Sequence, residues 1–138
     1  MIATTHVDLM ITAKKRGIKT RVIHGASVVS AVRGISGLQN YKFGKAVTIP
    51  FFEEGFVSET PYTVIKENKE IGLHTMCYLD IKADEKRYLT VNEALKSLLE
   101  LEKQKKEHVI TSKTLVVGVA RAGSPQPVVK AGYLEDVI

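Results

Sequence analysis

Three short segments place small or polar residues at the end of a predicted strand, an arrangement that is typical of small-molecule sites. They are residues 23–28, 79–81 and 120–124, which read Ile-His-Gly-Ala-Ser-Val, Leu-Asp-Ile and Ala-Arg-Ala-Gly-Ser. Small side chains let a ligand approach the backbone, whose N–H and C=O groups can then bind an adenine or an amino-acid group. Taken alone, the pattern predicts a small-molecule cleft between two lobes and no particular reaction.

The candidate acids and bases lie beside the same strands. His24 and His74 each border a predicted strand, and Asp80 ends one. A histidine there can act as a base, although a hydrogen-bonded structural role is the more common one. A carboxylate at a strand end often lies at the mouth of a site in an open α/β sheet, and a local turn contact is an equal alternative. The pattern therefore assigns no catalytic residue.

Several classes of site have no motif in this chain. The sequence contains no Walker-type phosphate loop, no Gly-x-Gly-x-x-Gly after a strand, no Cys-x-x-Cys and no His-Glu-x-x-His. We therefore predict no metal site. The one cysteine, Cys77, lies among apolar neighbours and is predicted to fill part of the core.

The charge of the chain could indicate a nucleic-acid partner, because the 138 residues carry a formal net charge of +5. The basic clusters at 14–16 and 103–106 fall, however, at the predicted C-terminal ends of helices, where cations complement the helix dipole. We therefore expect no nucleic-acid partner. The apolar runs, such as 115–120, are too short to cross a membrane, and the first residues do not resemble a signal peptide. A cytoplasmic location is expected.

Apolar spacing and end signals predict alternating helices and strands. Helices are predicted at 4–16 before Gly17, at 27–33 with Ser27 as N-cap, from 60 to Gly72, and at 90–106 behind a capping box of Thr90 and Glu93. Strands are predicted at 20–24, 46–51, 74–81, 114–120 and 128–133, with loops around Gly55 and at 123–127. The runs 74–81 and 114–120 are apolar enough for strands buried on both faces. This alternation favours an α/β fold.

The ends of the chain suggest a missing part. Residues 1–38 offer only one predicted strand, which cannot satisfy its own edges. The last four residues, 135–138, end on an apolar pair without a tail. We therefore expect this chain to be truncated at both ends.

Five segments together resemble a known family in order and spacing. They are Ala-Thr-Thr-His at 3–6, Arg-Val-Ile-His-Gly-Ala-Ser at 21–27, Gly-Leu-Gln at 37–39 with Tyr-Lys-Phe-Gly at 41–44, Gly-Leu-His-Thr at 72–75 with Leu-Asp-Ile-Lys at 79–82, and Val-Ala-Arg-Ala-Gly at 119–123. The chain resembles the diphthine synthase family, which belongs to the tetrapyrrole-methylase-like class of methyltransferases.

The resemblance implies a fold and an activity. It implies two α/β lobes, with 1–38 as a remnant of an N-terminal donor-binding lobe, 39–45 as a connector, and 46–138 as a nearly complete mixed-sheet C-terminal lobe. It implies transfer of methyl groups from S-adenosylmethionine, with S-adenosylhomocysteine as product, to a modified histidine of elongation factor 2 in diphthamide biosynthesis. It also implies a homodimer.

The resemblance also implies which residues contact the methyl donor. The matching positions are Ile2, Ser27, Val28, Leu79 and Ala122. A helix start at Ser27 offers free backbone donors, and Leu79 could pack on the adenine or the methionine chain. None of these is an acid or a base, but methyl transfer from a sulfonium needs mainly alignment and exclusion of water.

The chain departs from the family in one large respect. The glycine-rich first strand and a Gly-Asp-Pro motif, whose aspartate contacts the donor, would precede Met1, and a further segment would follow Ile138. We therefore expect the isolated chain to bind S-adenosylhomocysteine weakly or not at all. The alternative function is that of an inactive remnant that retains a dimer or partner surface.

Overall fold

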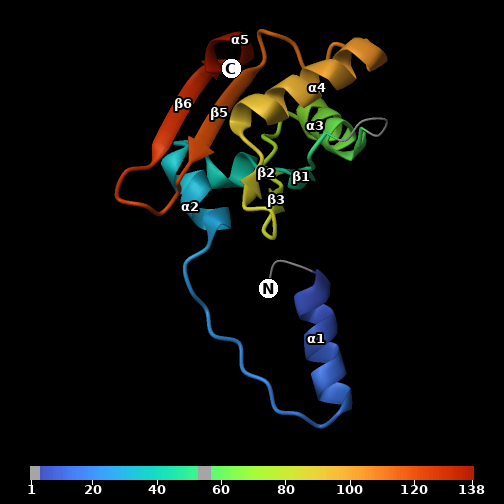
Figure 1. The fold of residues 1–138 in the computed structure, drawn as a ribbon, viewed down its shortest axis with the longest axis vertical. Coiled ribbons are helices and arrows are strands. Elements are labelled where there is room, and N and C mark those ends of the chain that lie inside the picture. Colours follow the sequence, from blue (N-terminus) through green and yellow to red (C-terminus); the bar gives the residue numbers. More distant parts are fainter. Residues whose placement is uncertain (1–3, 53–56) are drawn as a thin grey trace.

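The computed structural model describes residues 4–52 and 57–138, so the predicted loop around Gly55 lies outside the described residues. The chain folds into helices and short strands in alternation (Figure 1). The helices are α1 (Thr4–Lys15), α2 (Val28–Ile35), α3 (Thr60–Glu70), α4 (Val91–Lys105) and α5 (Leu134–Val137), with a single 3-10 turn, η1, at Asn40–Lys42. The strands are β1 (Val47–Ile49), β2 (Cys77–Leu79), β3 (Ile81–Lys82), β4 (Arg87–Tyr88), β5 (Leu115–Ala120) and β6 (Val128–Tyr133).

The strands form three pairs in the described part of the chain. β1 and β2 are parallel, with Val47 opposite Cys77 and Ile49 opposite Leu79. β3 and β4 form a short antiparallel hairpin. β5 and β6 are antiparallel over their full length. The parallel and antiparallel pairs together confirm the predicted mixed α/β class.

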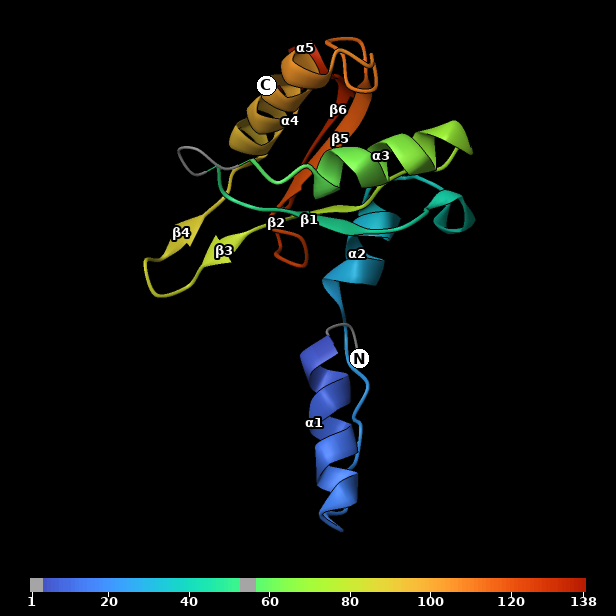
Figure 2. The ribbon, with the colours of Figure 1, turned by 90° about the vertical axis from the view of Figure 1, so that its right-hand side faces the viewer.

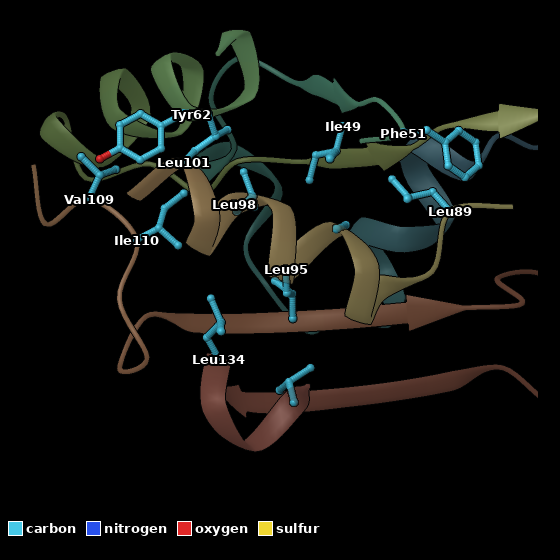
Figure 3. Packing of buried hydrophobic residues seen from close by; sticks show 12 residues of the cluster. Ile49, Phe51, Tyr62, Leu89, Leu95, Leu98, Leu101, Val109, Ile110 and Leu134 are labelled. Carbon is cyan, nitrogen blue, oxygen red and sulfur yellow. The ribbon is translucent and has the colours of Figure 1, made fainter. Parts of the chain in front are cut away.

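The core lies between α4 and the surrounding strands (Figure 3). α4 contributes the apolar face that its spacing predicts, and Tyr62 and Leu134 are each only 1% exposed. Burial of such side chains removes apolar surface from water, which is the main favourable term in folding. The buried cluster consists of Ile49, Phe51, Tyr62, Leu89, Ala94, Leu95, Leu98, Leu101, Val109, Ile110, Leu134 and Val137.

The predicted helix ends are confirmed. The Thr90 hydroxyl accepts a hydrogen bond from the Glu93 N–H at 3.2 Å, and the Glu93 carboxylate accepts one from the Thr90 N–H at 2.8 Å. Those bonds, from the Thr90 N–H first and its hydroxyl second, hold the pKa of Glu93 below its ordinary value. Gly17 and Gly72 follow α1 and α3 with φ of +69° and +70°, a conformation that glycine adopts without strain.

Residues 4–48 are packed differently from the rest. The structure buries none of them, and α1 is set apart from the other elements in two views at right angles (Figures 1 and 2). The predicted strand at 20–24 is wrong: this segment has no regular structure, and Ile23 is 82% exposed. A strand needs a partner for its N–H and C=O groups, and no described strand lies alongside this segment.

Two other strand predictions need correction. The run 74–81 is broken at Asp80, so that only Cys77–Leu79 joins β1 while Ile81 begins β3. β2 and β5 are largely half-buried rather than buried on both faces. Each pairs with a single strand among the described residues. The hairpin of β3 and β4 and the short helix α5 were not predicted. None of the described helices is long and apolar enough to cross a membrane.

Candidate functional site

The first predicted donor contact is the turn that opens α2. Ser27 is the N-cap, in an extended conformation, and its hydroxyl accepts a hydrogen bond from the Val29 N–H at 3.2 Å. The Ser27 carbonyl accepts the N–H groups of Ser30 and Ala31. In the described part of the chain the Val28 N–H has no such partner, so it remains a free donor at the positive end of a helix. The Val28 side chain is exposed.

The second predicted contact, Leu79, ends β2. The Leu79 side chain is half-buried and packs against the core cluster, and β2 is held in place by its pairing with β1. The neighbouring Asp80 donates its N–H to the Ile49 carbonyl at 3.1 Å, which extends the parallel pairing by one residue. Leu79 is therefore placed by the strand pairing and by the core.

The third predicted contact, Ala122, lies in a tight turn after β5. The Ser124 N–H donates to the Arg121 carbonyl at 3.1 Å, and Gly123 has a φ of +84°, as a type II turn requires at its third residue. Arg121 itself has a φ of +55°, which is uncommon for a residue with a side chain. Ala122 is half-buried, and its small side chain leaves the turn accessible.

The predicted contacts come from three separate segments that share one side of the molecule. α2 lies beneath the β1–β2 pair and at the level of the loop after β5 in both ribbon views (Figures 1 and 2). No hydrogen bond joins Ser27, Leu79 and Ala122 directly within the described residues. The remaining predicted contact, Ile2, lies outside the described residues.

An open depression of about 420 Å³ borders Phe51, Phe52, Leu89 and the start of α4, and none of the predicted donor contacts lines it. At the edge of this depression, the guanidinium group of Arg87 lies 4.4 Å from the centre of the Phe51 ring. This depression is therefore separate from the predicted donor contacts that the structure describes.

The other candidate residues have structural surroundings. The His74 ring lies edge-on to the Phe43 ring at 5.5 Å, and the Asp80 carboxylate accepts the N–H of Ile81 at 2.9 Å. His24 is exposed. Burial raises the pKa of the Cys77 thiol to about 11, which disfavours the reactive thiolate. Its half-buried side chain packs against the core cluster, of which it was predicted to form part. The described residues contain no cluster of potential metal ligands.

Comparisons with known proteins give a consistent result. The chain is 58% identical over 140 residues to the diphthine synthase of Methanocaldococcus jannaschii, with 100% of this chain and 54% of that protein covered. It is 51% identical over 137 residues to the diphthine synthase of Methanosphaera stadtmanae, with 99% of this chain and 52% of that protein covered. No family model matches the chain.

Solved structures agree. A crystal structure of a protein described as a putative diphthine synthase from Entamoeba histolytica has a TM-score of 0.88 at 38% identity and covers 97% of this chain and 54% of its own. A second crystal structure, of a diphthine synthase, has a TM-score of 0.85 at 39% identity and covers 99% of this chain and 49% of its own. This chain is related to the diphthine synthases over its whole length. Its fold is tetrapyrrole-methylase-like, as predicted, and it spans about half the length of the curated diphthine synthases it matches.

The sequence did not reveal three polar groups that each tie two segments of the chain together. The first is Asn68 on α3, which is 4% exposed. Its amide N–H group donates to the Lys45 carbonyl at 2.8 Å and the Thr75 hydroxyl at 2.9 Å, and its oxygen accepts the Lys45 N–H at 3.1 Å. Asn68 thereby ties together the segments that lead into β1 and β2, and so helps to place Leu79.

The second missed group is the Glu102 carboxylate near the end of α4. It accepts hydrogen bonds from the Tyr62 hydroxyl at 2.8 Å and from the N–H groups of His108, Val109 and Ile110 at 2.6, 2.9 and 2.9 Å. Desolvation raises the pKa of Glu102, but the donors, with the Ile110 N–H and the Tyr62 hydroxyl foremost, outweigh it and lower the pKa below its ordinary value. Burial, and then the bond to Glu102, raise the pKa of Tyr62 to about 12.

The third missed group is Arg33 on α2. Its guanidinium group donates from Nη1 to the Asn40 side-chain oxygen at 2.8 Å and lies 5.0 Å from the centre of the Phe43 ring. Its Nε atom is buried without a hydrogen-bond partner among the described residues. A buried donor without a partner costs about 1–3 kcal/mol, so this arrangement is retained at a measurable cost. In the sequence, the only sign of these contacts of Arg33 is a basic residue six positions after the Ser27 cap.

Proposed function

We propose that this chain forms part of an S-adenosylmethionine-dependent methyltransferase, a diphthine synthase, that methylates the modified histidine of elongation factor 2 in diphthamide biosynthesis. The observation that carries this proposal is the similarity to diphthine synthases along the entire chain, at 58% identity to the protein of Methanocaldococcus jannaschii. The division into a donor-binding lobe up to residue 38, a connector at 39–45 and a C-terminal lobe at 46–138, a homodimer and a cytoplasmic location belong to the same proposal.

The geometry of the predicted contacts supports donor binding. The free N–H of Val28 at the start of α2 can donate to a carboxylate or an adenine nitrogen of the donor. The turn around Ala122 exposes backbone next to a small side chain, and Leu79 offers an apolar surface. The roles left to this chain are binding and alignment, since in-line methyl transfer from a sulfonium needs an oriented acceptor and exclusion of water rather than a triad.

A complementation assay tests the proposal. The 138-residue chain would be mixed with the parts of the Methanocaldococcus jannaschii protein that this chain does not match. Labelled methyl transfer from S-adenosylmethionine to elongation factor 2 carrying the modified histidine would then be measured. We expect transfer by the mixture and weak or no binding of S-adenosylhomocysteine by the chain alone. A mixture that folds together and remains inactive would overturn the proposal.

A pair of variants links the assay to the predicted contact. Ala122→Phe fills the space beside the turn after β5 and should weaken binding of S-adenosylhomocysteine by the mixture in calorimetric titration. Ala131→Phe makes the same change at an exposed position of β6 and should leave that affinity unaltered. Equal losses in the two variants would remove Ala122 from the donor contacts.

The alternative function is that of an inactive remnant that retains a dimer or partner surface. Light scattering together with the methyl-transfer assay separates the two functions. A stable dimer of this chain that gains no transfer activity in the mixture would support the remnant.

A further inference from the structure

The segment 37–44 is part of the sequence resemblance but contains none of the predicted donor contacts. It lies between α2, which carries Ser27 and Val28, and β1. Gly37 has a φ of +71°, which reverses the chain after α2. The Ser36 hydroxyl donates to the Arg33 carbonyl at 2.9 Å and accepts the Leu38 N–H at 3.3 Å, which holds this reversal in place. The reversal brings Asn40 and Phe43 back to the side chain of Arg33.

Arg33 makes the hydrogen bond and the ring contact that join α2 to this returning segment. Its Nη1 atom donates to Asn40 at 2.8 Å, and its guanidinium group lies over the Phe43 ring at 5.0 Å. α2 has no fully buried residue, and the apolar residues on its inner face are only half-buried, so packing fixes its position weakly. The placement of α2 therefore depends in part on a cation–π contact and a single side-chain hydrogen bond.

Phe43 is in turn tied to the approach to β2. Its ring lies edge-on to the His74 ring at 5.5 Å. The His74 N–H donates to the Lys42 carbonyl at 2.7 Å, and the Gly44 N–H donates to the His74 carbonyl at 2.9 Å. His74 lies three residues before β2, the strand that ends at Leu79. The contacts thus run without a break from α2 through Phe43 and His74 to the strand that carries Leu79.

We propose that Arg33 is a positioning residue that fixes the α2 N-terminal turn, with Ser27 and Val28, relative to Leu79. The inference rests on the proposed function, because it takes these residues as two sides of one donor site. Arg33 itself is six residues from the Ser27 cap, near the C-terminal end of α2, and acts through Phe43 and Asn40 rather than on the donor. Arg33 does not belong to the buried cluster that forms the core of the described residues.

A distance measurement tests this without any donor. Spin labels on Ala31→Cys in α2 and Gln104→Cys in α4, both exposed positions, would report the placement of α2 in a common Cys77→Ser background. We expect a narrow distance distribution in the parent and a broad one after Arg33→Ala. Arg33→Lys, which keeps a cation near Phe43 but loses the planar fork, should be intermediate. Arg21→Ala removes the same charge from the exposed, irregular segment and should leave the distribution narrow.

The coupling to Phe43 gives a sharper form of the test. Phe43→Leu should broaden the distribution like Arg33→Ala, and the double variant should be no broader than either single one, because both remove the same contact. The thermal unfolding temperature of the core should be the same in Arg33→Ala as in the parent. A lower unfolding temperature would show a general loss of stability instead of a loss of positioning. A distribution as narrow in Arg33→Ala as in the parent would overturn the proposal.

Donor affinity completes the test. In the mixture with the complementary parts, Arg33→Ala should weaken binding of S-adenosylhomocysteine about three- to thirtyfold, the range expected for loss of a cation–π contact. A broad distribution with unaltered affinity would overturn the positioning role. If the parent mixture binds no S-adenosylhomocysteine, the proposed function fails, while the distance distributions still decide whether Arg33 holds α2.

Discussion

Residues 4–38 and the segment around Glu102 satisfy their polar groups in opposite ways. In residues 4–38 the hydrogen bonds among the described residues are local, and the bond from Arg33 to Asn40, seven positions away, is the one that leaves the segment. No residue there is buried as a whole. Around Glu102, one carboxylate on α4 accepts the hydroxyl of Tyr62, 40 residues away, and three backbone N–H groups of the next loop. Global stability therefore resides after residue 48, while two of the predicted donor contacts, Ser27 and Val28, lie where packing contributes little.

The largest expected effect contrasts two leucines. Leu98→Ala removes a side chain that is 5% exposed in the core, and we expect a loss of about 3 kcal/mol in the free energy of unfolding. Leu9→Ala makes the same change on α1, where the side chain is 68% exposed, and should alter it by less than about 0.5 kcal/mol. Urea unfolding followed by circular dichroism measures both. A comparable loss in Leu9→Ala would show that α1 packs on the rest of the chain in solution.

The next effect concerns the Glu102 carboxylate. Glu102→Gln replaces one acceptor oxygen by an NH2 group facing N–H and O–H donors, and should lower the free energy of unfolding by about 2 kcal/mol. Glu100→Gln, which removes only an exposed pair with Lys103 at 3.0 Å, should cost about 0.5 kcal/mol or less. Equal losses would mean that the donors around Glu102 contribute nothing beyond a surface charge.

The Glu102 carboxylate should make the free energy of unfolding depend on pH. The pKa of Glu102 is lower in the folded chain than the ordinary value of 4.5, so its contribution to stability is present above that value. The contribution is then lost as the pH falls through the folded-state pKa. Urea midpoints measured from pH 7 down to pH 3 should fall less steeply in Glu102→Gln than in the parent. Parallel curves would contradict the lowered pKa.

Two glycines should respond to the same substitution with opposite signs. A Cβ atom at Gly44 would lie 2.2 Å from the side-chain oxygen of Asn68, so Gly44→Ala must displace Asn68 from Lys45. We expect a loss of about 1–3 kcal/mol in the free energy of unfolding. A Cβ atom at Gly34, in α2, would have no atom within 4 Å. Gly34→Ala should therefore stabilise the helical conformation of α2 by about 1 kcal/mol, the difference in helix propensity between the two residues. Backbone chemical shifts of α2 and urea unfolding test the pair; a destabilised Gly34→Ala chain would count against it.

The sequence predicted the features that depend on neighbouring residues. The capping box of Thr90, the cap at Ser27 and the helix end at Gly72 all follow from contacts within a few positions. The sequence-based prediction failed where the structure of a segment depends on a distant partner. The β-branched run at 20–24 forms a strand only if another strand lies beside it. Asn68 bonds a residue 23 positions away, so its role has no local pattern to reveal it.

The predicted site shows the same difference between local and distant contacts. Ser27 could be placed at a helix start because its cap is a local signal, and the turn at Ala122 because Gly123 marks it. The contact of Arg33 with Phe43 could not be predicted, since it depends on a chain reversal at Gly37 that brings two separate segments together. Local signals thus predicted the individual contact segments, while their mutual arrangement required the tertiary structure.

The smallest expected effect compares two N-caps of the same type. Thr90→Ala removes the cap of α4, whose face forms much of the core, and should lower the free energy of global unfolding by about 1 kcal/mol. Ser27→Ala removes the bond to the Val29 N–H at 3.2 Å, but α2 has no buried residue through which this loss could reach the core. It should leave the urea midpoint unaltered and speed exchange of the Val29 amide hydrogen, because that N–H loses its acceptor. Thr90→Ser, which keeps the hydroxyl, is the control and should stay close to the parent. If Ser27→Ala lowered the midpoint as much as Thr90→Ala does, then α2 would be coupled to the core, and the contrast between the two regions would not hold.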